Sequence, residues 1–410
     1  MRRINYADVV LDEALPFDCY DEHGNFLLRQ GHVVNSEKQI EFLVDRGYFD
    51  ATVTAPAAPT PKRAMAEPPH VKEAKKTPFG VFELCKEQVR TLFSKLKIDN
   101  GSKLPEDITF EALKNVYRET IRNMHGGKPS NFQEQIFGVC RGLQALCKLD
   151  QDAAIGAVHL DPLCRYTTIH PMHKAVLSEI VATRLGVSPQ ERLPILAAAL
   201  TANISMLDLQ ELLHGQKSSP NEAQKRLILL HPQLSTEMLL ELGVQDKVWL
   251  DSVLQHHERA NGSGYHRSLK GRHILRSAQM LSLADIYGAM VKPRAYRDAI
   301  HAKEALSKIF MTRGSEVDGE LVQIFIKELG IYPPGSIVRL ENGEMAIVTR
   351  RGDSPTAPRV KSVFDGQGKP LDVSVSRDTS DRSYAIREII PRDKRMSFNF
   401  PLLWDYGLAA

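Results

Sequence analysis

The sequence has few cysteines and no strong excess of charge of one sign. Its five cysteines do not form a CxxC pair, which argues against a zinc finger and predicts reduced thiols in the cytoplasm. The 53 basic and 50 acidic residues give a net charge of only +3, whereas nucleic-acid-binding domains concentrate far more positive charge on one face. We therefore expect no nucleic-acid partner.

Long apolar runs are also missing. The longest candidate, residues 195–204, is interrupted by Asn203 and falls well short of the roughly 18 residues that a membrane span needs. The first ten residues contain two arginines with no long apolar segment behind them, unlike a secretory signal. The sequence predicts a cytoplasmic protein with no membrane partner.

At 410 residues, 42% of them hydrophobic, the chain is long enough for two or three domains. Apolar residues spaced by threes and fours indicate helices in the middle of the chain, and short apolar segments around turns indicate strands at both ends. The expected fold class is mainly α, a helical bundle with small β-rich domains at the N- and C-termini. The expected parts are a β-rich domain (1–53), an Ala/Pro/Lys-rich linker (54–78), a helical domain (79–330), a second β-rich domain (331–394) and a tail (395–410).

Histidines are concentrated in the helical part. Nine of the 14 lie between residues 159 and 273. In the helix that leads to His256 and His257, Trp249 and Val253 form an apolar stripe that turns the histidine pair inward. This pattern predicts buried imidazoles, either as metal ligands or as core histidines with satisfied hydrogen bonds.

A carboxylate is expected among these histidines. In the predicted helix 273–291, Asp285 lies on the same face as several apolar residues, and a buried carboxylate must be paired or bound to a cation. His170 opens another apolar helix, and His231 follows Leu227 by one turn. Imidazole and carboxylate together suit Zn, Fe or Mn, so a metal site is one of two open interpretations.

Two segments then point to a family. HHERANGSGYHRSLKG (256–271) and LADIYGAMVKPRAYRDA (283–299) resemble the HD-GYP family of bacterial, metal-dependent cyclic di-GMP phosphodiesterases. The resemblance extends to YTTIHPMHKAV (166–176) and LILLHPQLSTEMLLELG (227–243), and it covers about residues 160–310. It implies an HD-type helical bundle with a function in cyclic di-GMP signalling.

The central motif of that family is altered here. The family carries His-Asp-x-Gly-Lys after a helix, whereas the aligned positions hold Ala202, Asn203, Ser205 and Met206. In the family the aspartate bridges two metal ions, so its replacement implies that catalysis in the family manner is lost. We therefore expect no catalytic residues at these positions.

The resemblance divides the remaining ligands unequally. His231, His256 and His257 correspond to a complete ligand set for one metal, and His170 with Asp285 to part of a second set. We expect at most one divalent transition metal ion, Fe, Mn or Zn.

The resemblance also implies a nucleotide site. Arg294 and Arg297 align with positions that contact phosphate, and Gly264 and Tyr265 lie in the segment that corresponds to GYP. A guanidinium suits phosphate because it offers forked donors and a permanent charge. Ordinary surface arginines and a packing tyrosine remain alternatives.

Three functional interpretations follow. The first is a degenerate HD-GYP protein that binds cyclic di-GMP or a partner without efficient turnover. The second is a metal-dependent cyclic di-GMP phosphodiesterase with an altered site, and the third is a nucleotide-independent scaffold for a partner such as a diguanylate cyclase (GGDEF) protein. A homodimer is compatible with each of them.

Overall fold

The computed structural model divides the chain into two units, Met1–Glu73 and Ala74–Ala410. It describes isolated positions between residues 2 and 49, and then residues 109–124, 131–160, 165–292, 300–390 and 403–404. The expected linker at 54–78 and the first part of the expected helical domain, 79–108, lie outside the described residues.

The first unit contains a small antiparallel sheet with the strand order β1-β4-β2-β3. Its strands are β1 (Arg2–Arg3), β2 (Cys19–Tyr20), β3 (Phe26–Leu28) and β4 (Tyr48–Phe49). Cys19 is fully buried in a small apolar core, and the rings of Phe17 and Phe49 stack with centroids 4.0 Å apart. This unit has its own core, built from a few apolar side chains.

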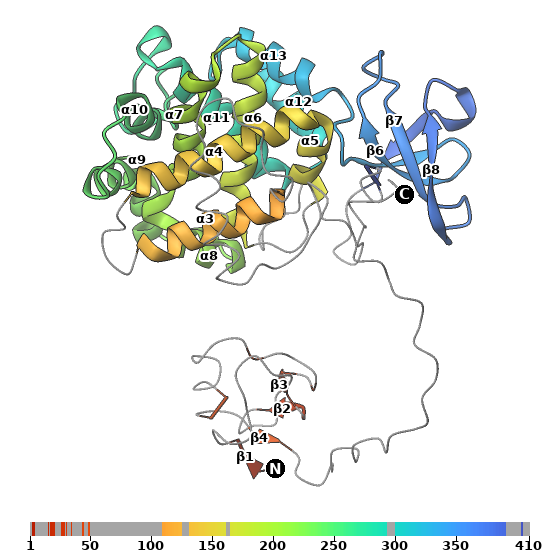
Figure 1. Ribbon diagram of the computed structural model, residues 1–410, viewed down its shortest axis with the longest axis horizontal. Coiled ribbons are helices and arrows are strands. Elements are labelled where there is room, and N and C mark those ends of the chain that lie inside the picture. The colour runs from red at the N-terminus through yellow and green to blue at the C-terminus, as the bar shows by residue number, and fades with distance from the viewer. Residues whose placement is uncertain are drawn as a thin grey trace. The chain divides into compact units, whose positions relative to one another are not determined.

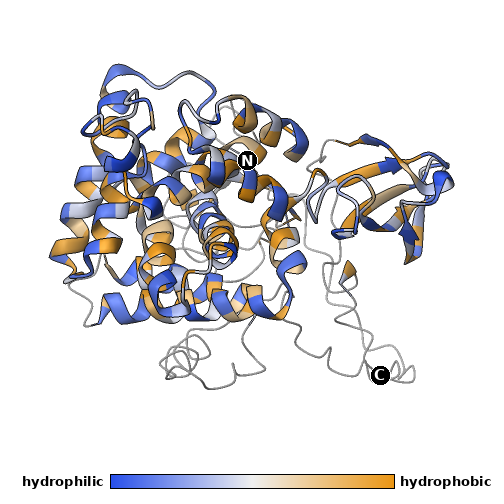
Figure 2. Cartoon of the chain, turned by 90° about the horizontal axis from the view of Figure 1, so that it is seen from above, coloured by the Kyte–Doolittle hydropathy of each residue, from blue (hydrophilic) through white to orange (hydrophobic). Residues whose placement is uncertain are grey.

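The second unit is mainly helical (Figure 1). Its helices are α3 (Phe110–Met124), α4 (Phe132–Leu149), α5 (Gln151–Leu160), α6 (Tyr166–Arg184), α7 (Pro189–Thr201), α8 (Leu207–Gly215), α9 (Glu222–Glu241), α10 (Lys247–Gln255), α11 (Arg276–Val291), α12 (Ala302–Met311) and α13 (Gly319–Leu329). Short 3-10 turns lie at Ile204–Met206 and Gly271–His273. Many of these helices have an apolar and a polar side (Figure 2), as expected when one face packs on a core.

Helices α6 and α7 form the centre of this core. Almost every residue of α6 is buried, which explains its long apolar sequence. Helix α7 begins with a capping box, in which Ser188 accepts from the backbone N–H of Glu191 while the Glu191 side chain accepts from the N–H of Ser188. At its other end, Trp249 Nε1 of α10 donates to Thr201 Oγ1 at 2.7 Å, which fixes α10 against the end of α7.

The C-terminal part is a five-stranded antiparallel sheet with the order β8-β7-β6-β5-β9. Its strands are β5 (Ile337–Leu340), β6 (Met345–Arg350), β7 (Arg359–Phe364), β8 (Pro370–Asp378) and β9 (Ile386–Ile389). Strands β5 and β6 pair across a turn in which Gly343 has a φ of 86°, a conformation that favours glycine. The expected fold class, mainly α with small β-rich parts at both termini, is therefore confirmed.

The sheet is joined to the helical core by polar contacts. Arg350 pairs with Asp150 at 2.6 Å, and Arg351 pairs with Asp152. From the expected tail, Trp404 is buried against helix α5, where a Cβ at Gly156 would meet its ring. Residues 391–402 and 405–410 lie outside the described part of the chain.

Within the described residues, one helical run, Pro189–Gly215, is long and apolar enough to cross a membrane by length and composition alone. In the most apolar 18-residue stretch of this run, 61% of the residues are buried inside the protein, as is common in the core helices of globular proteins. A single run of this kind is weak support for a membrane span.

Candidate metal centre

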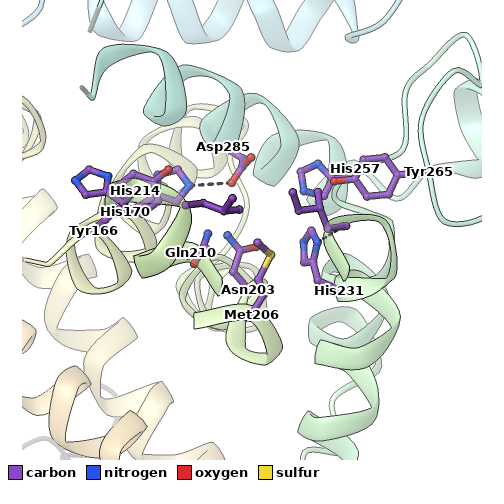
Figure 3. A pocket seen from close by; sticks show the side chains of 12 residues that line it. Tyr166, His170, Asn203, Met206, Gln210, His214, His231, His257, Tyr265 and Asp285 are labelled. Carbon is purple, nitrogen blue, oxygen red and sulfur yellow. Dashed lines mark hydrogen bonds and ion pairs between the residues drawn. The ribbon is translucent and has the colours of Figure 1, made fainter. Parts of the chain in front are cut away.

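A pocket opens between α6, α8, α9, α11 and the segment that follows α10 (Figure 3). Its cavity has a volume of about 190 Å³. A water molecule in the liquid takes about 30 Å³, so the cavity has room for an ion together with several waters. It is lined by Tyr166, His170, Asn203, Met206, Gln210, Leu213, His214, Ile228, His231, His257, Tyr265 and Asp285.

Three histidines meet at one side of this pocket. His231 comes from the middle of α9, His256 is the residue at the C-terminal end of α10, and His257 follows it. One possible ligand atom from each ring lies within 4.8 Å of the other two. The structure thus brings together the three residues that the family resemblance implied as a ligand set.

Backbone carbonyls determine which ring nitrogens carry protons. His231 Nδ1 lies 2.6 Å from the Ile228 carbonyl oxygen, and His256 Nδ1 lies 2.6 Å from that of Val253. A carbonyl can only accept a hydrogen bond, so each Nδ1 is the donor. The two Nε2 atoms, which then bear lone pairs, lie 3.2 Å apart. A cation between them relieves the repulsion of these lone pairs, and metal-binding histidines commonly have this arrangement.

Burial keeps the three imidazoles neutral. It lowers the pKa of His231 from 6.5 to about 4 and that of His257 to about 3. Burial, reinforced by the two neighbouring imidazoles, also lowers the pKa of His256 well below its usual value. Because the neutral ring is the form that binds metals, the donor set fits a transition metal ion.

Tyr265 packs directly on this cluster. Its ring stacks on His257 with centroids 4.6 Å apart and an angle of 25° between the planes, and both side chains line the pocket (Figure 3). The backbone N–H of Tyr265 donates to the His257 carbonyl at 3.2 Å. Tyr265 therefore positions His257, which supports the alternative that Tyr265 is a packing residue. Tyr265 nevertheless lines the pocket as well.

The loop that carries Tyr265 is organised by a buried carboxylate. Glu258 accepts from the N–H groups of Arg267 at 2.7 Å and Leu269 at 2.9 Å. At Gly264, a Cβ would lie 2.4 Å from the Arg259 nitrogen, closer than any real contact. The loop's own backbone therefore requires this glycine.

Asp285, which lines the same pocket, belongs to an ion pair whose cation was not predicted from the sequence. Asp285 Oδ1 lies 3.0 Å from His170 Nε2 and 3.2 Å from Lys174 Nζ. Lys174 is fully buried. The sequence could have indicated this cation, because Lys174 follows His170 by one helical turn in a helix that is otherwise largely apolar.

The charges of this pair depend on each other. Burial alone would raise the pKa of the Asp285 carboxyl, but the Lys174 ammonium and the bond from His170 hold it well below its usual value. Burial lowers the pKa of Lys174, and the Asp285 carboxylate opposes that effect. The carboxylate that the sequence predicts to be buried keeps 14% of its side chain exposed and is paired with a protein cation.

The positions of the altered motif line or adjoin the pocket. Ala202 is fully buried at the end of α7, and its methyl group offers no ligand atom. Among the described residues, the buried side-chain oxygens of Asn203 and Gln210 have no hydrogen-bond partner, and both residues line the pocket with Met206. The pocket therefore contains two neutral amide oxygens in addition to its histidines and Asp285.

Two further rings at the pocket were not predicted. Tyr166 stacks between His170, at 4.8 Å, and His214, at 5.1 Å, measured between ring centroids. Tyr166 precedes His170 by one helical turn, which is the signal that could have found it. The predicted phosphate contacts Arg294 and Arg297 lie outside the described residues.

A comparison with known protein families found one that matches the part of the chain that contains the histidine cluster. Residues 157–321 match the HD domain family, which places the pocket within the match. These residues are therefore similar to an HD domain.

The curated proteins that this chain resembles include several cyclic-dinucleotide phosphodiesterases. A cyclic di-GMP phosphodiesterase of Pseudomonas aeruginosa is 29% identical over 219 residues, 53% of each chain. A cyclic di-GMP phosphodiesterase of Borreliella burgdorferi is 21% identical over 50% of this chain and 54% of its own. A 3'3'-cGAMP-specific phosphodiesterase of Vibrio cholerae is 26% identical over 42% of this chain and 38% of its own. The chain spans about half or less of the length of these relatives. Together with the HD domain match, they confirm the resemblance to the HD-GYP family.

A solved structure of an HDG"Y"P protein from Bdellovibrio bacteriovorus is also similar. The match covers 79% of this chain and 97% of that chain, with a TM-score of 0.45 and 15% identity.

Proposed function

We propose that this protein is a regulatory HD-GYP-type protein that binds cyclic di-GMP at a one-metal site without efficient turnover. The observation that carries the proposal is the contrast between the two sides of the pocket. Three neutral histidines offer a complete donor set, whereas the position of the bridging carboxylate is a neutral Asn203. The function is therefore to hold the nucleotide rather than to cleave it.

The histidine side supports one divalent transition metal ion, Fe, Mn or Zn. His231, His256 and His257 would hold it, and the unpaired oxygen of Asn203 is a neutral donor in the same pocket. A metal of this type supplies Lewis-acid polarisation of a bound oxygen. His170 and Asp285 are weaker members of the site because they bond to each other, and Asp285 also pairs with Lys174.

In this proposal, turnover is lost because the chain has no carboxylate at the position that would bridge two metal ions. Two-metal hydrolysis uses ions about 3.5–4 Å apart that stabilise both the attacking and the leaving oxygen. An anionic ligand with two oxygens can neutralise and join such ions. Asn203 is neutral and Ala202 has no ligand atom, so the chain lacks the means to hold that pair.

The proposed ligand is a cyclic dinucleotide because the relatives are named for such substrates, cyclic di-GMP in two cases and 3'3'-cGAMP in one. Gly264 and Tyr265 would form one wall, and Arg294 with Arg297 would contact the phosphates. In this proposal the protein is cytoplasmic, acts without nucleic acid or membrane, and transmits nucleotide occupancy to a partner such as a GGDEF protein or a second copy of itself.

The test combines calorimetry with product analysis. Protein loaded with Fe, Mn or Zn is titrated with cyclic di-GMP, and the mixture is analysed for the linear dinucleotide. We expect saturable binding, at most a trace of linear product, and loss of the metal from His257→Ala. The matched control is His273→Ala, which removes an exposed histidine and should retain the metal.

A residual phosphodiesterase is the second candidate, because three histidines with an open position suffice for hydrolysis on other folds. Steady release of linear dinucleotide that disappears in His257→Ala would favour that candidate. Metal-free protein without measurable nucleotide affinity would contradict both candidates and favour an interaction scaffold.

A further inference from the structure

A protein cation lies beside the pocket and pairs with Asp285, a residue of the pocket wall. Lys174 Nζ lies 3.2 Å from Asp285 Oδ1, and the same oxygen lies 3.0 Å from His170 Nε2. The hydrogen bond between His170 and Asp285 is drawn in Figure 3. Lys174 and Asp285 come from the central helix α6 and from α11, so the pair also joins two core helices.

The buried ammonium depends on this carboxylate. Lys174 has no exposed surface, and a buried charge is costly unless a charge of opposite sign accompanies it. Among the residues that line the pocket in the described chain, Asp285 is the one carboxylate. Asp285 is therefore already neutralised by the protein.

A second metal ion on this side would meet the ammonium directly. Carboxylate oxygens bind transition metals at about 2.0–2.2 Å, so an ion on Asp285 Oδ1 would lie no more than about 5.4 Å from Lys174 Nζ. Two cations at that distance in a buried pocket repel each other strongly. Because Ala202 supplies no further ligand, the residues on this side do not fit a metal.

We propose that the Lys174 ammonium replaces the second metal ion as the fixed counter-ion of Asp285. An ammonium neutralises the carboxylate and holds His170 and Asp285 in place, but it has no coordination position on which to activate water. The site is thereby limited to one ion on the three histidines, an assignment that rests on the proposed function.

The first test counts metal ions. Wild type, the double variant Ala202→His/Asn203→Asp, and the same double variant with Lys174→Met are loaded with Mn or Zn, desalted and analysed by mass spectrometry. We expect one ion per chain in the wild type and in the double variant, and two in the triple variant. Two ions in the double variant, or a single ion in the triple variant, would overturn the proposal.

The second test does not depend on metal. In the presence of a chelator, Lys174→Met and Asp285→Asn should each lower the melting temperature by about 5 °C or more. The first leaves the Asp285 carboxylate without its cation, and the second leaves the buried ammonium without its counter-ion. The double variant should lose clearly less than the sum of the two, and it should fold even where Lys174→Met does not. Additive losses would contradict the pairing.

A matched control is Lys308→Met. Lys308 pairs with Glu304 at 2.8 Å, but its side chain is 57% exposed, so its loss should change the melting temperature little. If the wild type holds no metal, the proposed function is contradicted. The melting temperatures of Lys174→Met, Asp285→Asn and their double variant would still decide whether Lys174 pairs with Asp285.

Discussion

At the scale of single residues, the pocket is defined by which groups carry charge. The three histidines are kept neutral by burial, and carbonyls orient two of them by accepting from Nδ1. Opposite them, one carboxylate and one ammonium neutralise each other. The pocket therefore has free donor atoms on one side and a balanced ion pair on the other, which is the physical basis for a single cation site.

The loop glycine gives a prediction at this scale. Gly264→Ala should lower metal affinity by about tenfold or more and reduce stability, because its Cβ would lie 2.4 Å from the Arg259 nitrogen and the loop must move. Such a shift misplaces Tyr265, which stacks on His257. A misplacement of about 1 Å has large effects at functional sites. The measurement is a competition with a chelator of known affinity, together with thermal unfolding.

The control for this change is Gly215→Ala. A Cβ at Gly215 has no neighbour within 4 Å, and alanine is the better helix former, so neither affinity nor stability should fall. Equal behaviour of the two variants would contradict the packing argument for Gly264.

At the scale of secondary-structure elements, the helices that carry the ligands are tied to the core by their ends. Helix α10 begins where Asp246 accepts from the N–H of Trp249, and the Trp249 indole donates to Thr201 at the end of α7. This contact fixes both the helix that delivers His256 and the turn that holds Asn203. Accurate placement of the pocket thus depends on buried polar links between helices.

The link between α10 and α7 can be tested with Thr201→Val. The substitution leaves a buried indole N–H without its acceptor, which should cost about 1–3 kcal/mol of unfolding free energy. Thr120→Val is the control, because the buried hydroxyls of Thr120 and Thr201 both donate to a carbonyl of their own helix, whereas the indole N–H donates to Thr201. Denaturant unfolding should show a clearly larger loss for Thr201→Val, and equal losses would refute the role of the indole.

Much of this arrangement was predictable from local patterns. Apolar spacing predicted that His256 and the face of α11 with Asp285 point inward, and both are found there. The partner of Asp285 was not predicted, because Lys174 lies more than 100 residues away and its position depends on how α6 packs against α11. Periodicity shows which face of a helix is buried, but not which residue of another helix it meets.

At the scale of the second unit, the C-terminal sheet and the helical core are connected through His159. Its Nδ1 lies 3.0 Å from the Ile155 carbonyl oxygen and 2.9 Å from that of Pro334, and its Nε2 lies 2.7 Å from the Tyr287 hydroxyl. Nδ1 therefore carries the proton, and the tyrosine hydroxyl donates to Nε2. All three contacts are satisfied by a neutral ring, which joins the segment before β5 to α5 and α11.

This contact predicts how stability depends on pH. Burial lowers the pKa of His159 from 6.5 to about 4, so between these values the unfolded chain binds a proton that the folded chain does not. The contribution of His159 to the free energy of unfolding is fully present above about pH 6.5. It is lost as the pH falls toward 4, which lowers the free energy of unfolding by about 3 kcal/mol in total. In chelator, His159→Gln should therefore flatten the fall in unfolding free energy over this range, whereas His273→Gln, at an exposed position, should leave it as steep as in the wild type. An unchanged slope in His159→Gln would show that the joint between sheet and helices does not depend on a neutral His159.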